Sequence, residues 1–114
     1  GSKGNKMILS ELRTILETIP MFEGKVVYYA WAEGTVPDLP FICYLVTDTD
    51  NFVADNRVYE IIQNVDIELY TRIKDLNAEN AIEETLNNNN IVWNKAETFL
   101  KDENCFMITY SITI

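Results

Sequence analysis

The chain contains no histidine, which limits what its other polar residues can do chemically. Without histidine it cannot form a Ser-His-Asp or Cys-His triad, or any zinc site that needs an imidazole. Its two cysteines, Cys43 and Cys105, are far apart in the sequence, and no CxxC pair or glycine-rich phosphate loop is present. The residue types therefore predict no catalytic site, no metal and no cofactor.

The acidic segment 48–51 (DTDN) is the nearest match to a calcium-binding loop. An EF-hand loop that begins at Asp48 needs an oxygen ligand at position 52, glycine at 53 and glutamate at 59. Phe52, Val53 and Tyr59 occupy these positions. All three requirements fail, so a solvated turn is the favoured interpretation.

Paired carboxylates are the remaining candidates for acid–base chemistry. Asp66 and Glu68 are two residues apart and alternate with apolar residues, as does Glu60 before them. This spacing is typical of the solvent-facing side of a strand. We therefore expect Glu60, Asp66 and Glu68 to form an acidic, exposed face.

Tyr28, Tyr29 and Trp31 form an aromatic cluster of the kind on which nucleic-acid bases stack. Base-stacking platforms come with basic grooves, and the nearest basic residue here is the single Lys25. Packing in a core or an interface is the favoured role of these aromatic residues.

The composition sets the class of the protein. The 114 residues have a net charge of −9, with 47% hydrophobic and 24% charged residues, which is typical of one soluble globular domain. The acidity argues against binding to phosphate backbones or anionic membranes. Residues 1–6 resemble an expression-tag remnant, with residues 7–114 as a single domain; removing Lys3 and Lys6 takes the charge to about −11.

The apolar pattern predicts two helices and five strands. One helix is expected over residues 7–19 and ends before Pro20. A second helix is expected over 76–86, with Asp75 as its N-cap and the asparagines 87–90 at its C-terminal end. Strands are expected over 25–31, 41–47, 58–70, 91–100 and 105–114. Residues 33–40 and 48–56 are expected to be a loop and a long turn.

The order α-β-β-β-α-β-β predicts an α+β fold with a mainly antiparallel five-stranded sheet and two helices on one face. The first three strands are expected to form a meander and the last two a hairpin. The third strand is long, so a bend or bulge is expected near Gln63. Cys43 and Cys105 lie in apolar runs, which favours two buried thiols over a disulfide.

Several short motifs together resemble the small tail-terminator or tail-completion proteins of long-tailed phages and prophages of Gram-positive bacteria. They are residues 28–31 (YYAW), 34–44 (GTVPDLPFICY), 55–59 (DNRVY), 67–71 (IELYT), Asp75, Glu79 and 110–114 (YSITI). The resemblance extends over nearly all of residues 7–114, and its motifs are short and largely structural.

The resemblance implies a virion structural protein with no cofactor. Such proteins cap the head-proximal end of the tail tube, commonly as a six-subunit ring, and join it to the head connector. The implied partners are further copies of the chain, the tail tube protein and the connector, with assembly in the bacterial cytoplasm. An acidic ring wall would let DNA pass without sticking.

Candidate contact residues follow from exposed apolar positions in the predicted loops. They are Trp31, Val36, Pro37 and Leu39 in or beside the proline-rich loop, and Phe52 and Val53 in the acidic turn.

Three alternatives remain open. One is another head–tail joining protein of similar fold, and the second is a monomeric module that takes a partner strand on its sheet edge. The third is a hydrolase or transferase that uses only carboxylates, which no spacing in the sequence supports.

Overall fold

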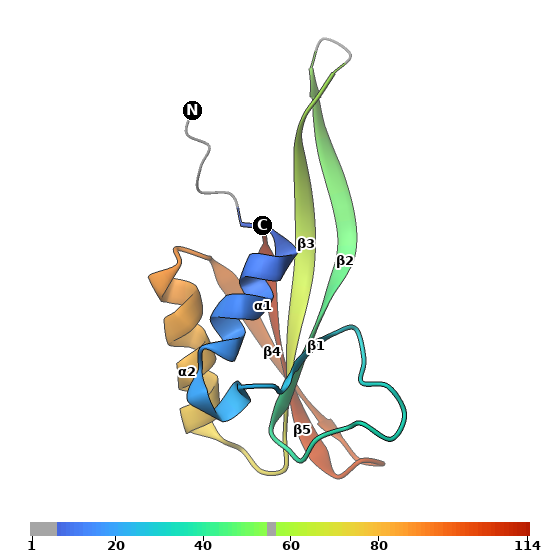
Figure 1. Ribbon diagram of the computed structural model, residues 1–114, viewed down its shortest axis with the longest axis vertical. Coiled ribbons are helices and arrows are strands. Elements are labelled where there is room, and N and C mark those ends of the chain that lie inside the picture. Colours follow the sequence, from blue (N-terminus) through green and yellow to red (C-terminus); the bar gives the residue numbers. More distant parts are fainter. Residues whose placement is uncertain (1–6, 55–56) are drawn as a thin grey trace.

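In this computed structural model, the chain forms a five-stranded sheet with two helices on one face (Figure 1). The structure describes residues 7–54 and 57–114, with side chains described outside 50–61. The elements are α1 (Leu9–Glu17), η2 (Pro20–Phe22), β1 (Val26–Tyr28), β2 (Phe41–Ala54), β3 (Arg57–Thr71), α2 (Leu76–Asn88), β4 (Trp93–Leu100) and β5 (Cys105–Thr113). The predicted α+β order and the predominantly antiparallel sheet are confirmed.

Both predicted helices form, but α1 is two residues shorter at each end than predicted, and α2 continues two residues further. The Glu11 side chain accepts a hydrogen bond from the Ile8 backbone N at 3.1 Å at the start of α1, and Pro20 follows its end. The Asp75 side chain accepts from the Ala78 backbone N at 3.0 Å at the start of α2. Asn90, just beyond α2, has a φ of 58°, a left-handed conformation that asparagine tolerates.

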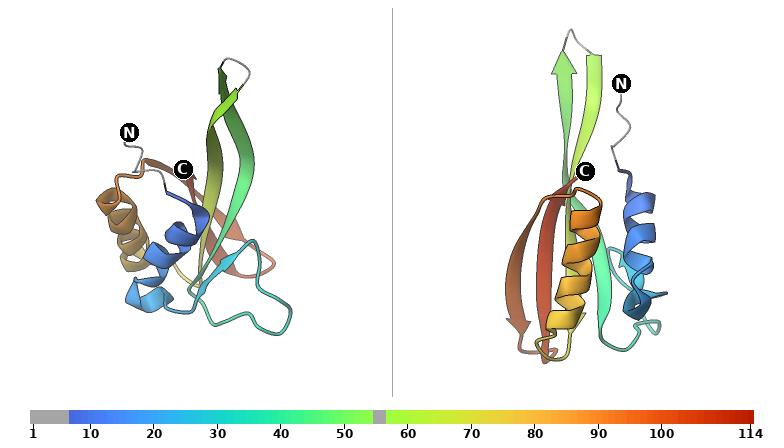
Figure 2. Two further views of the ribbon diagram at one scale, coloured as in Figure 1. Left: turned by 45° about the horizontal axis from the view of Figure 1, so that its top comes forward. Right: turned by 90° about the vertical axis from the view of Figure 1, so that its left-hand side faces the viewer.

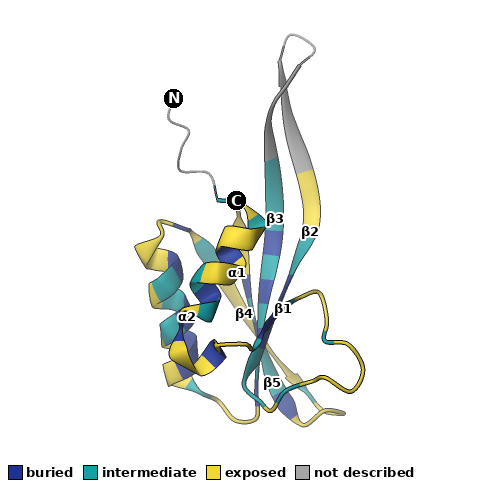
Figure 3. Ribbon diagram, viewed as in Figure 1, coloured by how far each residue is buried: buried dark blue, intermediate teal, exposed yellow. Residues whose placement is uncertain are grey.

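The core lies between the helices and one face of the sheet (Figure 3). Val65, Ile67 and Leu69 on β3 are buried there, as their alternation predicts. The helices and the neighbouring strands contribute Leu12, Leu16, Phe22, Ile42, Ile82, Leu86, Ile108 and Tyr110. The same alternation predicts that Tyr59 and Ile61 face the core, but their side chains lie outside the described ones.

The sheet order is β1-β2-β3-β5-β4, and the predicted meander is wrong at its first step. β1 pairs with β2 in parallel, with Val26 opposite Ile42 and Tyr28 opposite Tyr44. β1 is also shorter than predicted, because Tyr29 has a φ of 72° and turns the chain out of the sheet. Residues 29–40 then return the chain so that β2 starts beside the start of β1.

The predicted turn over residues 48–56 is wrong for most of its length, because β2 continues to Ala54. Its polar residues pair with the first half of β3, from Asp48 opposite Asn64 to Ala54 opposite Arg57. Polar residues are compatible with a strand that has little sheet around it, so the polarity of this segment does not require a turn. Residues 55–56 lie outside the described part.

The expected irregularity near Gln63 occurs on the partner strand. The register between β2 and β3 shifts between Val46 and Asp48, so Thr47 is the extra residue opposite Val65 and Asn64. The Thr47 hydroxyl donates to the Asn64 carbonyl oxygen at 3.1 Å, which holds the bulge in place.

The outer halves of β2 and β3 form a hairpin arm, residues 49–54 and 57–62. β5 follows β3 only as far as Asn64, and the last bonds on that side join Gln63 to Ile114 at 2.9 Å. Beyond them the arm rises past the helices as a two-stranded ribbon (Figure 2). It makes the molecule elongated, with extents of 51 × 26 × 25 Å.

Candidate functional site

The hairpin arm leaves both of its edges without a neighbouring strand among the described residues. On the β2 side, β1 pairs only with residues 42–44, and the last bond there joins the Tyr29 N–H to the Tyr44 carbonyl at 2.7 Å. On the β3 side, pairing with β5 extends only as far as Asn64. Phe52 and Val53, predicted as contact residues, lie in the arm but outside the described side chains.

The loop over residues 29–40 holds the other predicted contact residues, and the structure separates them. Trp31 is half-buried, and its ring meets Phe41 edge-on at a centroid distance of 6.0 Å. Pro37 and Leu39 are also half-buried, whereas Val36 is 58% exposed. Trp31 therefore anchors the loop, and of these four residues only Val36 is largely free for a partner.

The predicted acidic face lies on the side of the sheet without helices. Asp66 and Glu68 are half-buried and not exposed as predicted, because their neighbours on this face cover them. Asp66 accepts a hydrogen bond from Ser111 at 2.9 Å, and Glu68 accepts one from Tyr70 at 2.8 Å. The side chain of Glu60 lies outside the described ones. The two described carboxylates bond to different partners and form no joint site.

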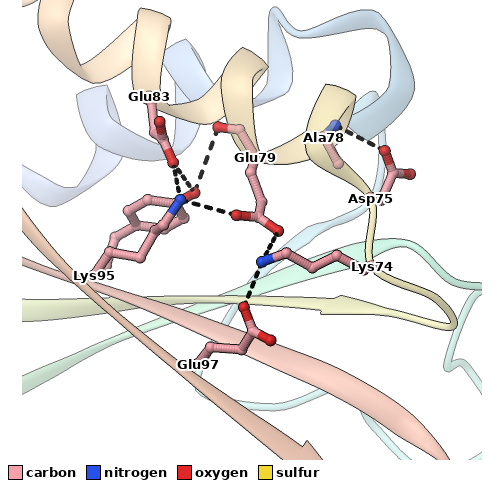
Figure 4. Close-up of polar contacts among 8 residues, drawn as sticks. Lys74, Asp75, Ala78, Glu79, Glu83, Lys95 and Glu97 are labelled. Carbon is pink, nitrogen blue, oxygen red and sulfur yellow. Dashed lines mark hydrogen bonds and ion pairs between the residues drawn. The ribbon is translucent and has the colours of Figure 1, made fainter.

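A cluster of charges between α2 and β4, the Glu79 cluster, holds the one buried charged side chain in the described part (Figure 4). Glu79 is 1% exposed; Lys95 Nζ lies 2.9 Å from its Oε1, and Lys74 Nζ lies 2.8 Å from its Oε2. Lys95 also binds Glu83 at 2.6 Å, and Lys74 binds Glu97. The two lysines thus join the helix to the edge strand of the sheet.

Tyr110 connects this cluster to the core. It is fully buried on β5 and donates its hydroxyl hydrogen to Glu83 at 2.8 Å. Burial and that hydrogen bond to Glu83 raise the pKa of Tyr110 far above its ordinary value, so it remains a neutral donor. Trp93 packs edge-on against its ring at 5.5 Å.

Opposing effects set the charge of Glu79. Burial alone raises its pKa, but the contacts with Lys74 and Lys95 together outweigh burial, and the pKa falls below its ordinary value. Hydrogen bonds to their carboxylate partners raise the pKa of both lysines. The cluster is therefore charged at neutral pH, and all its members serve to hold β4 against α2.

Sequence reasoning missed this cluster, although one signal was available. Glu79 lies three residues before Ile82 and seven before Leu86, on the same inward stripe of α2. A carboxylate on a buried stripe needs a cation, and Lys95 shares a face of β4 with the half-buried Trp93.

The prediction of two buried, unpaired thiols is confirmed, since Cys43 and Cys105 are each 5% exposed and free. Burial, followed by the charge of Glu68, raises the pKa of Cys43 to about 11, and burial also raises the pKa of Cys105. We expect the folded protein at about pH 8 to react with Ellman's reagent far more slowly than a free thiol does. Both thiols should react in urea. Fast reaction in the folded state, assigned with Cys43→Ser and Cys105→Ser, would contradict this burial.

Within the described ranges, no group of three or more His, Cys, Asp or Glu residues is placed to hold a metal ion. None of the helices in the same ranges is long and apolar enough to cross a membrane. No known protein-family model matches the chain, and no curated protein matches it.

Proposed function

We propose that the chain is a structural subunit of a phage tail that caps the tail tube and takes part in head–tail joining, as a ring of identical copies. The sequence motifs that resemble tail-terminator proteins support this assignment. The observation that carries it is the hairpin arm, because a solitary two-stranded ribbon is marginally stable in water and gains most from a partner.

The unpaired edges favour self-association in particular. β2 beyond Tyr44 forms one edge of the sheet and β4 forms the other, since the sheet order places β4 outside β5. Contact between these two unlike edges on neighbouring copies is head-to-tail, and head-to-tail contacts close into rings when the rotation between copies allows. Pairing would also satisfy backbone groups that an open edge leaves to water.

The charge distribution fits a ring around viral DNA. The chain carries a net charge of −9, and Asp66 and Glu68 lie on the sheet face that no helix covers. A like-charged wall repels the phosphate backbone and lets DNA pass without sticking. The tail tube protein and the head connector are the proposed partners on the two sides of the ring, in the virion tail and in the host cytoplasm during assembly.

A second candidate function rests on the same edge. A monomeric binding module could accept an extended strand from an unrelated partner along β2, by strand addition. Such a module would show no tendency to associate with itself.

Sedimentation velocity across a salt series distinguishes the two candidates. We expect assemblies larger than a dimer that increase with salt, because screening weakens repulsion between subunits of the same charge. Removing residues 51–61, the part of the arm from Asn51 to its partner Ile61, should abolish these assemblies without unfolding the body. The substitution Met21→Ser, at an exposed apolar residue of η2 outside the arm and both sheet edges, serves as the control. A monomer at every salt and protein concentration would favour the binding module.

A further inference from the structure

The edge of β2 that faces β1 is covered only at its start. The Ile42 N–H donates to the Lys25 carbonyl oxygen at 2.9 Å, and the Tyr29 N–H donates to the Tyr44 carbonyl oxygen at 2.7 Å. Backbone groups of alternate residues point to the same edge, and the register is regular up to Val46. Val46 therefore presents its N–H and C=O on this edge, where no strand of the described part pairs with it.

Tyr29 turns the chain away from this open position in a strained conformation (Figure 1). Its φ is 72°, and the Ala30 N–H donates to the Tyr28 carbonyl oxygen at 2.9 Å, which closes a three-residue turn. A γ-turn with positive φ is rare and strained. A side chain disfavours left-handed backbone by a factor of about 5–30 in population, so an extended Tyr29 is relieved of a penalty that the turn imposes.

The residues after the turn are suited to a strand. Tyr29 and Trp31 are aromatic, and no glycine or proline occurs in residues 26–32. If residues 29–31 were extended, the parallel register would continue from Tyr28 opposite Tyr44. The Val46 N–H would then donate to the Tyr29 carbonyl oxygen, and the Trp31 N–H would donate to the Val46 carbonyl oxygen.

The loop is long enough for this pairing. With residues 29–31 in the sheet, residues 32–40 would have to return the chain from beside Thr47 to Phe41. Residues 41–47 of β2 span about 20 Å, and residues 32–40 reach up to about 30 Å when extended.

One contact holds the loop in the turned-out form. The Trp31 ring packs edge-on against Phe41 at 6.0 Å, but its indole N–H is buried and has no hydrogen-bond partner in the described part of the chain. Buried donors are nearly always bonded. Release of Trp31 therefore loses apolar packing and breaks no side-chain hydrogen bond.

We propose that residues 29–31 form a retractable cover for the edge of β2 at residues 45–47, next to the hairpin arm. Tyr29 is the hinge between the turned-out form and an extended form paired with Val46. Because Val46 can bond to only one strand on this side, the extended form excludes a partner strand at this point. The pairing is a property of the single chain, and its effect on assembly rests on the proposed function.

Disulfide trapping tests the pairing. Ala30 and Val46 are opposite each other in the extended form, so the pair Ala30→Cys/Val46→Cys should form a disulfide in glutathione disulfide. The control pair Glu33→Cys/Val46→Cys, from the same loop but out of register, should react at least about tenfold more slowly. Adding Tyr29→Gly, which tolerates the left-handed turn, should slow the first pair about tenfold. Equal rates for the two pairs, or no effect of Tyr29→Gly, would overturn the inference.

The trapped chain also tests the competition with a partner strand. By sedimentation velocity, the oxidised Ala30→Cys/Val46→Cys chain should stay monomeric at a salt concentration where its reduced form assembles, and dithiothreitol should restore assembly. Equal assembly of both forms would overturn the cover. If the reduced form and the unaltered chain both stay monomeric at every salt concentration, the proposed function fails, and the trapping rates still decide the pairing.

Discussion

The double substitution Lys74→Met/Lys95→Met should lower the free energy of unfolding at pH 7 by about 2–4 kcal/mol, because it leaves Glu79 buried without a counter-ion. Removing one partner of a fully buried pair costs about 3–5 kcal/mol, and the partial exposure of both lysines reduces that figure here. Urea denaturation measures the change. A loss below about 1 kcal/mol would contradict a buried, charged Glu79.

Restoring an uncharged cluster provides the control. Adding Glu79→Leu to the double variant should recover most of the lost stability, since a well-packed apolar residue often replaces a buried ion pair without loss. The substitution Glu97→Gln removes a carboxylate that is 41% exposed and should change the stability by less than about 1 kcal/mol.

The free energy of unfolding should also depend on pH in opposite directions in the unaltered chain and in the double variant. In the unaltered chain the pKa of Glu79 lies below its ordinary value of 4.5, so the stabilisation is present above that pH and is lost as the pH falls through the lowered pKa. In the double-methionine variant only burial remains, and the pKa of Glu79 rises. The contribution of Glu79 to the free energy of unfolding should then decrease as the pH rises above 4.5, the ordinary pKa of the residue. The slope of stability against pH in this range is therefore opposite in sign to that of the unaltered chain.

The substitution Ile67→Ala should lower the free energy of unfolding by about 2–4 kcal/mol, because it leaves a cavity at the centre of the core. Ile67 is fully buried on β3, opposite Tyr44 of β2 on one side and Tyr110 of β5 on the other. Both neighbouring strands are held in place by the sheet, so the site has little freedom to collapse around the smaller side chain.

The next residue on β3 provides the matched control. Glu68 points to the face without helices and is half-buried, with one hydrogen bond from Tyr70. Glu68→Ala should cost less than about 1 kcal/mol in the same denaturation experiment. Equal losses for the two substitutions would show that the assignment of the two faces of β3 is wrong.

Local patterns predicted the elements of the fold because each has a cause within a few residues. The stripe through Leu12 and Leu16, the Asp75 cap and the alternation through Ile67 each fix one element regardless of the rest. The parallel pairing of β1 with β2 depends on how the loop 29–40 returns, which no local pattern specifies. The extension of β2 to Ala54 could not be predicted from the sequence, because polar residues are as typical of a turn as of a two-stranded ribbon.

The candidate surfaces were predictable only in part, because contact depends on what covers a residue. Val36 and Trp31 look alike as apolar residues in a polar loop, yet Trp31 packs on Phe41 and Val36 does not. The Glu79 cluster joins residues from α2, β4 and the segment before α2, and only the tertiary fold brings Lys74 and Lys95 to the same carboxylate.

Electron microscopy of phage particles made without this gene product tests the proposed function most directly. The proposal predicts tails of uncontrolled length and heads without attached tails, because nothing would cap the tube or join it to the connector. Supplying the unaltered chain from a plasmid should restore normal particles, and the chain with the shortened arm should not. Tails of normal length joined to heads in the complete absence of the gene product would contradict the proposal.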